Sequence, residues 1–303
     1  MTEVQNVTPA EAFAAYLKVR NRLPAAAGRG RAVPGEFLDI ADDFDLILFD
    51  AYGVLNVGET AIPGAAETMA ALRGAGKTVA VVSNSAAYSK AHMMGRYARL
   101  GFNFDPSEVV TSREALFERI KSEPPRRWGV MLNPISGLAE LETLDAHVLT
   151  DTREVYDEVD GFLLIGSDGW TEHRQGLLEA TLARTSRPVF IGNPDLVAPR
   201  EAGLSLEPGW FAHRLADRTG IAPVFLGKPF PEIFELALAR FGGSVPPERV
   251  LMVGDTLHTD ILGGAQAGFA TALVTAHGSL AGLSVVESIT ASKIAPDFVV
   301  ETI

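Results

Sequence analysis

Short, unbroken runs of apolar residues recur along the 303-residue chain, and each is bounded by glycine or polar residues. Such runs are typical of strands buried on both faces of a parallel sheet. Segments with helical spacing of apolar positions lie between them, and several end at a glycine. This alternation predicts an α/β protein. The predicted strands are 46–49, 78–82, 109–110, 129–132, 146–149, 161–165, 188–191, 224–226, 250–253, 272–274 and 298–300.

Helix signals and breaker-rich segments divide the chain further. Thr8, Pro9 and Glu11 form a helix start, with an N-cap, a proline and an acid in the first turn. Residues 25–34 are rich in Gly, Ala and Arg, which predicts a loop. Residues 123–127 contain two prolines and are a candidate boundary between domains. The predicted helices are 9–19, 66–74, 89–100, 113–121, 138–144, 172–184, 210–218, 231–241 and 261–267. We expect an N-terminal helical extension (1–40), a core (41–122 and 222–303) and an inserted α/β cap domain (123–221).

Composition narrows the class of protein. Hydrophobic residues make up 47% and charged residues 21%, which is ordinary for a globular protein. There is no cysteine, so disulfides and thiolate metal sites are excluded. The formal net charge of −12 argues against nucleic acid or an anionic membrane as partner. No apolar run has the length of a membrane span, and no secretion signal is evident, so we expect a cytoplasmic protein.

Four of the predicted strands are followed by a polar side chain suited to phosphate chemistry. These side chains are Asp50, Ser83, Lys228 and Asp255. If their strands share one parallel sheet, all four lie at its carboxyl edge, where ligands bind in such folds. After Asp50, Gly53 allows a tight turn in which backbone N–H groups face an anion.

Each of these side chains has a chemical role available to it. Asp50 can attack phosphorus, and Asp255 can hold Mg²⁺, with Asp260 as a second carboxylate nearby. Lys228 can bind phosphoryl oxygens, and Ser83 can donate its hydroxyl. Each residue by itself also fits a purely structural role, because Asp and Ser commonly cap helices and lysine is common on the protein surface. Together, and in this order, they favour a phosphate site.

The same segments resemble the four motifs of the haloacid dehalogenase (HAD) superfamily. The insertion between the second and third motifs, with GNPDLVAPRE at 192–201, is similar to the class IIA, NagD-like branch. The resemblance covers roughly residues 44 to 300. The four motifs are DAYGVL (50–55), VVSNS (81–85), GKPFPEIF (227–234) and GDTLHTDILGGAQAG (254–268).

This resemblance implies a Rossmann-like core with a C2-type α/β cap and Mg²⁺-dependent phosphatase activity on a small phosphorylated metabolite. It implies that Asp50 is the nucleophile, with Ser83 and Lys228 as phosphate ligands and Asn84 adjacent. The implied metal site is Asp50, the backbone carbonyl of Tyr52 and Asp255, supported by Asp260. The cap is expected to supply substrate contacts, with Asn193 and Asp195 as candidates, and caps of this type often pair two subunits.

Tyr52 departs from the family pattern. Phosphatases of this superfamily usually carry a second Asp two residues after the nucleophile, as general acid and base. A tyrosine with a pKa of about 10 is a poor general base near neutral pH. The change predicts a slow enzyme, in which Tyr52 still donates a hydrogen bond and His258 is a conceivable substitute.

Two alternatives follow from Tyr52. The protein could bind a phosphorylated metabolite and hydrolyse it poorly. DAYG also resembles the first motif of the 2-haloacid dehalogenases, whose nucleophile attacks carbon without a metal. Asp255 and Asp260, together with the large cap, favour the phosphatase over the dehalogenase.

Overall fold

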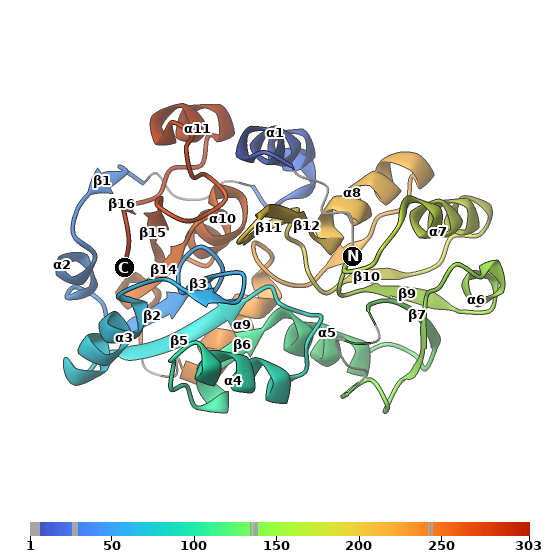
Figure 1. The fold of residues 1–303 in the computed structure, drawn as a ribbon, viewed down its shortest axis with the longest axis horizontal. Helices are drawn as coiled ribbons and strands as arrows, with labels where there is room; N and C mark the ends of the chain where they lie inside the picture. The colour runs from blue at the N-terminus through green and yellow to red at the C-terminus, as the bar shows by residue number, and fades with distance from the viewer. Residues whose placement is uncertain (1–6, 26–29, 134, 136–138, 242, 244) are drawn as a thin grey trace.

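Two parallel sheets, each packed against helices, organise the chain (Figure 1). The computed structural model describes residues 7–25, 30–133, 135, 139–241, 243 and 245–303. The larger sheet has seven strands in the order β1-β16-β15-β14-β2-β5-β6, and the smaller has five in the order β13-β10-β9-β7-β8. Every neighbouring pair in both sheets is parallel. The predicted α/β fold with a Rossmann-like core is confirmed.

The strands of the larger sheet are β1 (Val33–Pro34), β2 (Leu46–Phe49), β5 (Thr78–Ser83), β6 (Val109–Thr111), β14 (Val250–Gly254), β15 (Ala270–Val274) and β16 (Phe298–Val300). Those of the smaller sheet are β7 (Arg127–Met131), β8 (Asp145–Val148), β9 (Gly161–Leu164), β10 (Val189–Ile191) and β13 (Val224–Phe225). Two antiparallel hairpins are separate from both sheets: β3 (Asn56–Val57) with β4 (Thr60–Ala61), and β11 (Val197–Arg200) with β12 (Gly203–Leu206).

The described α-helices are α1 (Pro9–Val19), α2 (Phe37–Ala41), α3 (Ala65–Gly74), α4 (Lys90–Arg99), α5 (Ser112–Lys121), α6 (Arg153–Asp157), α7 (Glu172–Arg184), α8 (Pro208–Thr219), α9 (Pro231–Phe241), α10 (Leu262–Gln266) and α11 (Val285–Ser292). Short 3₁₀ turns lie at Arg20–Arg22, Pro106–Glu108 and Pro247–Arg249, and a π-helix spans Leu257–Ile261.

The central strand β2 shows why the apolar runs carry no alternation. Ile47 and Phe49 pack in the cluster that α2, α3 and α4 complete on one face. Leu46 and Leu48 pack in the cluster that α5 and α9 complete on the other. Because both faces of the strand are covered, every position in it is apolar and buried.

The structure corrects three of the predicted elements. The strand predicted at 224–226 lies in the five-stranded sheet as β13, so it does not share a sheet with the strands before Asp50, Ser83 and Asp255. Of the helix predicted at 138–144, residue 138 lies outside the described residues, and 139–144 form turns and a bend, because Glu140 has φ +73°, which a right-handed helix does not allow. The loop predicted at 25–34 contains the edge strand β1.

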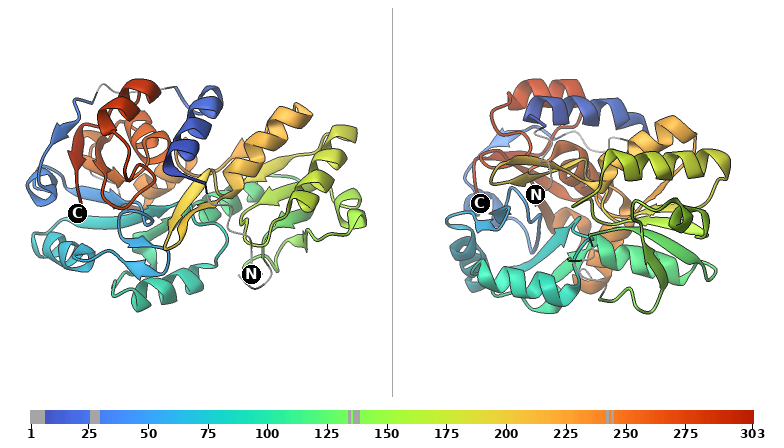
Figure 2. Two further views of the ribbon diagram at one scale, coloured as in Figure 1. Left: turned by 45° about the horizontal axis from the view of Figure 1, so that its top comes forward. Right: turned by 45° about the vertical axis from the view of Figure 1, so that its right-hand side comes forward.

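The two sheets meet through the hairpins. Backbone N–H of Gly58, in the turn between β3 and β4, donates to the carbonyl of Pro199 on β11 at 3.2 Å. The next amide, Glu59, donates to the Glu201 carboxylate at 2.6 Å. Hairpin β11–β12 therefore lies against the segment that follows β2, between the two sheets (Figures 1 and 2).

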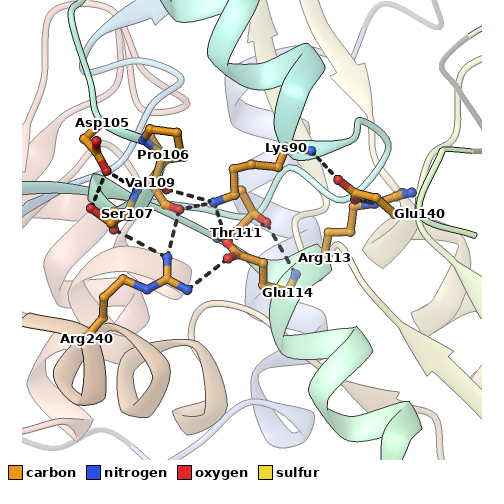
Figure 3. Close-up of polar contacts among 10 residues, drawn as sticks. All are labelled: Lys90, Asp105, Pro106, Ser107, Val109, Thr111, Arg113, Glu114, Glu140 and Arg240. Carbon is orange, nitrogen blue, oxygen red and sulfur yellow. Dashed lines mark hydrogen bonds and ion pairs between the residues drawn. The ribbon is translucent and has the colours of Figure 1, made fainter.

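A polar network joins α4, α5 and α9 beside β6 (Figure 3). The Glu114 carboxylate of α5 forms ion pairs with Lys90 at 2.8 Å and with Arg240 at 2.9 Å. It also accepts a hydrogen bond from the Thr111 amide at 2.9 Å, which completes a capping box at the start of α5. One partly buried carboxylate thus holds three helices together.

A neighbouring contact ties this network to the second sheet. Arg113 of α5 is buried and pairs with Glu140, in the segment between β7 and β8, at 3.0 Å. The same glutamate accepts from the Lys90 amide at 3.0 Å. The segment that leaves β7 is therefore anchored on α4 and α5.

None of the described helices is long and apolar enough to cross a bilayer.

We predict that Glu114→Gln lowers the free energy of unfolding by about 1–3 kcal/mol near neutral pH, because two charged donors lose their anionic partner. Burial alone would raise the pKa of Glu114, but its bonds to Lys90 and Arg240 bring it below the ordinary value. Such a carboxyl stabilises the fold above its unfolded pKa, so the deficit should shrink as the pH falls below about 4.

Urea unfolding at a series of pH values measures this deficit. Glu118→Gln, on the exposed side of the same helix, is the matched control, because Glu118 forms an ion pair with exposed Lys121. Equal losses of stability in the two variants would show that the network does not hold the helices.

Candidate active site

Three of the predicted site residues lie together at the carboxyl edge of the larger sheet. Asp50 follows β2, Asp255 follows β14 on one side of it, and Ser83 ends β5 on the other. The Asp50 amide donates to the carbonyl of Val253 at 2.8 Å, so the hydrogen bonding between β2 and β14 extends to Asp50 itself. The parallel register therefore brings the three side chains to one place.

Lys228 reaches the same place from the other sheet, because the chain crosses back to the core just after β13. Its ammonium lies 2.5 Å from Asp50 Oδ1 and 2.8 Å from Asp260 Oδ1, and the residue is only 1% exposed. Burial would lower the pKa of Lys228, but the charges of Asp260 and Asp50 outweigh it and raise that pKa. Lys228 is therefore a permanent cation beside Asp50.

Asn84 has a structural role at this site. Its side-chain carbonyl accepts from the Lys228 amide at 2.7 Å, and its Nδ2 donates to the Lys228 carbonyl at 2.9 Å. The same Nδ2 donates to Asp195 Oδ1 at 2.8 Å. The amide thus holds the backbone of Lys228 from both sides, which sets where the ammonium can reach.

Asp50, Asp255 and Asp260 form a candidate metal centre. One carboxylate oxygen from each lies within 4.8 Å of the others. The pKa of Asp255 is raised by burial and by the charges of Asp260 and Asp50, and burial also raises the pKa of Asp50 against the effect of Lys228. Three buried carboxylates with one ammonium are short of positive charge, and clustered carboxylate oxygens suit a hard divalent cation. The residues present therefore fit a divalent metal.

The remaining contacts of these acids hold them in place. Asp255 accepts from the Thr256 hydroxyl at 3.0 Å and from the Ser279 amide at 2.6 Å. Asp260 accepts from the Thr256 amide at 3.1 Å. Thr256 lies within the fourth motif, whereas Ser279 lies outside all four motifs and acts through its backbone amide, which only the fold brings to Asp255.

Gly53 forms the tight turn that the sequence predicts after Asp50. Its N–H donates to the carbonyl of Asn56 at 2.8 Å and so closes the loop after β2. Gly53 has φ +79°, and a Cβ there would lie 2.8 Å from Asp255 Cγ. The glycine is needed for the turn and for the close approach of Asp255.

Tyr52 lies between two arginines. Its ring is 4.8 Å from the guanidinium of Arg96 and 4.7 Å from that of Arg200, distances at which cation–π attraction operates. Its hydroxyl oxygen accepts a hydrogen bond from Arg200 at 3.0 Å. The side chain of Tyr52 is thus bound by an arginine of hairpin β11–β12.

Arg200 is held by residues in hairpin β11–β12 and directly after it. It pairs with Glu207 at 2.9 Å, and its Nε donates to the Ser205 hydroxyl at 2.9 Å. Sequence reasoning singled out the surrounding segment but missed Arg200, since its contact with Tyr52 joins positions 148 residues apart.

A cavity of about 890 Å³ opens above the carboxylates. Its lining includes Asp50, Tyr52, Ser83 and Asp255 from the core and Asn193 and Asp195 from the inserted segment. The side chain of Asn193 is engaged within that segment, because it donates to Glu207 at 3.1 Å and accepts from the Asp195 amide at 3.0 Å. Asp195 also lines the cavity, where its Oδ1 accepts from Asn84, and burial raises the pKa of Asp195 well above the ordinary value.

His258 is not placed to substitute for the missing acid–base residue. It is 1% exposed, lies outside the lining of the cavity and stacks on Tyr16 of α1. Burial lowers its pKa to about 3, so it is neutral. The sequence could not show this, because the stacking partner lies in the N-terminal helix.

Comparisons with known proteins agree with this geometry. A family model described as haloacid dehalogenase-like hydrolase matches residues 47–145, and a second model of HAD-like hydrolases matches 225–303. Chronophin of Bos taurus is 34% identical over 262 residues, which cover 80% of this chain and 82% of that protein. Glycerol-3-phosphate phosphatase of Homo sapiens is 28% identical over 298 residues, covering 86% and 89%.

Solved structures show the same fold. NagD from Escherichia coli aligns with a TM-score of 0.65 at 24% identity, over 86% of this chain and 96% of that one. A glycerol phosphate phosphatase from Mycobacterium tuberculosis, solved in complex with calcium, aligns with a TM-score of 0.62 at 25% identity. That alignment covers 79% of this chain and 68% of the other.

A carboxylate cluster at the edge of a Rossmann-like sheet, opposite a second α/β sheet, defines a capped hydrolase of phosphate esters. The chain belongs to the haloacid dehalogenase-like hydrolase family, in its NagD-like, class IIA branch. It is a phosphoric monoester hydrolase of that family.

We predict that Lys228→Met lowers the free energy of unfolding by about 3–5 kcal/mol near neutral pH, because it leaves buried carboxylates without their cation. Urea unfolding in the presence of EDTA measures this loss. Lys121→Met, at an exposed lysine, is the control. A loss no larger than that of the control would contradict the charge balance described here.

Proposed function

We propose that the protein is a Mg²⁺-dependent phosphatase that hydrolyses a small phosphorylated metabolite through an aspartyl-phosphate on Asp50. The observation that carries the proposal is the position of the Asp50 carboxylate. It lines the cavity, is 2.5 Å from a buried ammonium, and belongs to the three-carboxylate cluster. A nucleophile, a fixed cation and a metal site thereby coincide.

The residues divide the work in this proposal. Asp50, the backbone carbonyl of Tyr52, Asp255 and Asp260 hold the metal, which offsets the repulsion between the carboxylates and the phosphate dianion. Lys228 and the Ser83 hydroxyl bind the non-bridging phosphoryl oxygens. Asn84 holds the Lys228 backbone, which keeps the ammonium near Asp50 while Asp50 is phosphorylated.

The chemistry proceeds in two displacements. An Asp50 oxygen forms a bond to phosphorus as the bond to the leaving oxygen breaks, and the leaving oxygen takes up a proton. Water then attacks phosphorus, phosphate leaves, a proton is released, and the Asp50 carboxylate is regenerated. The proton must come from a group near the leaving oxygen, where the family usually has an aspartate and this chain has Tyr52.

Tyr52 makes the enzyme slow in this account. General acid–base help contributes about 10²–10⁴-fold, and a phenol supplies less of it than a carboxyl group near neutral pH. Its hydroxyl oxygen accepts from Arg200, which leaves the phenolic proton free to be donated.

The substrate is proposed to be a small organic phosphate. Relatives named glycerol-3-phosphate phosphatase and acid sugar phosphatase support this class, as does a cavity of about 890 Å³. We place Asp195 on the cap side as a contact to the leaving group. Location in the cytoplasm and pairing of two chains through the cap are further parts of the proposal.

The contact between Tyr52 and Arg200 also favours a second function, binding of a phosphorylated metabolite with little turnover. A dehalogenase is less well supported, because that reaction has no use for the cluster of Asp50, Asp255 and Asp260.

We expect phosphate release from p-nitrophenyl phosphate, sugar phosphates or nucleotides with Mg²⁺, and none above background with EDTA or in Asp50→Asn. The amide keeps the shape of the side chain but lacks the nucleophilic charge. Glu172→Gln is a control, since Glu172 lines the cavity but pairs with Arg214. Equal release from native protein and Asp50→Asn would reject the phosphatase, and halide release from 2-haloacids in EDTA would identify the dehalogenase.

A second prediction concerns position 52. Tyr52→Asp should raise kcat by at least about tenfold, because it supplies a carboxyl group for proton transfer. Tyr52→Asn should not raise kcat, because asparagine has the size of aspartate but no acidic proton. An equal rise in both variants would mean that relief of the Arg200 contact, rather than acid–base chemistry, limits the rate.

A further inference from the structure

The N-terminal helix α1 lies across the junction between the core and the inserted segment (Figures 1 and 2). On the cap side, Ala12, Tyr16 and Val19 pack in one cluster with Leu196, Val197 and Leu204. On the core side, Phe13 packs against the cluster around the π-helix and α11. Helix α1 precedes the first region matched by a family model, which begins at residue 47.

Further contacts extend this junction at both ends of the helix. Before α1, Val7 forms an antiparallel bridge with Leu204 of β12. After it, Arg22 forms an ion pair with Asp217 of α8. The N-terminal segment is therefore fastened to the cap at three places and to the core along one face.

Tyr16 contacts segments from both sides of the active site. It is 4% exposed, and its hydroxyl oxygen accepts from the amide of Leu196, directly after Asp195, at 3.1 Å. Its ring stacks on His258 with centroids 4.9 Å apart and planes 9° apart. His258 lies in the π-helix that carries Asp260, two residues before it.

The π-helix itself suggests a functional demand. Single turns of π-helix are rare and frequently occur at functional sites. Here it begins two residues after Asp255 and places Asp260 beside Lys228. The flat contact of His258 with Tyr16 packs α1 against this turn.

We propose that Tyr16 is a positioning residue of the active site. Its hydroxyl holds the Asp195–Leu196 segment over the cavity, and its ring holds the π-helix that carries Asp260. The inference rests on the proposed function, since it assigns Tyr16 to the substrate side through one contact and to the metal side through the other.

Two variants of the full-length protein separate these contacts. Tyr16→Phe keeps the ring and leaves the Leu196 amide unpaired. We expect its KM for p-nitrophenyl phosphate to rise roughly fivefold, the effect of one buried hydrogen bond, while its Mg²⁺ affinity is unchanged. Tyr16→Leu also removes the stacking, so both KM and the dissociation constant for Mg²⁺ should rise.

Tyr156→Phe is the matched control. Tyr156 is a buried tyrosine of α6 whose hydroxyl donates to the Thr150 carbonyl at 2.9 Å, outside the lining of the cavity. Its loss should lower the melting temperature about as much as Tyr16→Phe does, yet leave KM and Mg²⁺ affinity unchanged. A purely structural role for Tyr16 predicts the same behaviour as the control.

Two readouts are independent of turnover. Calorimetry measures Mg²⁺ binding, and hydrogen exchange measures protection of residues 192–206 and 255–262. Faster exchange in 192–206 for Tyr16→Phe, and in both segments for Tyr16→Leu, is expected. Folded Tyr16 variants with native exchange, KM and Mg²⁺ affinity would overturn the proposal. Native protein without phosphatase activity would instead remove the proposed function, and exchange and calorimetry would still test Tyr16.

Discussion

The buried ammonium of Lys228 is the interaction on which the rest of the site depends. Placing Asp50, Asp255 and Asp260 within 4.8 Å of one another, away from water, carries a large electrostatic cost. Lys228 offsets part of it through contacts of 2.5 Å to Asp50 and 2.8 Å to Asp260. A divalent metal would offset the rest, so the charge deficit that destabilises the edge is also what makes it a metal site.

Holding that ammonium requires both parts of the protein. The chain reaches Lys228 through β13, which belongs to the smaller sheet, and the Lys228 backbone is hydrogen-bonded to Asn84, which directly follows β5 of the larger sheet. Arg200 on the inserted hairpin binds Tyr52 in the loop after Asp50. The position of the cap and the geometry of the carboxylates are thus coupled through named contacts.

Apolar runs and strand-end polar residues were enough to predict the parallel sheet and the meeting of Asp50, Ser83 and Asp255, because the carboxyl ends of neighbouring parallel strands lie at one edge of the sheet. The sequence could not show to which of the two sheets residues 224–225 belong. A two-residue edge strand carries too little pattern to favour one sheet over the other. The roles of Arg200, Asn84 and Tyr16 depend on contacts between distant segments, which no local pattern encodes. The tight turn at Gly53 was predictable, because glycine is favoured where the backbone needs a positive φ.

The central claim is that Asp50 becomes phosphorylated during turnover. The most direct test is to mix the protein with p-nitrophenyl phosphate and Mg²⁺, quench rapidly with acid, and examine the peptide containing residue 50 by mass spectrometry. The account predicts a phosphoryl group on Asp50 in native protein, and none with EDTA or in Asp50→Asn. Phosphate release with no phosphorylated Asp50 at any quench time, or with the group on another residue, would contradict it.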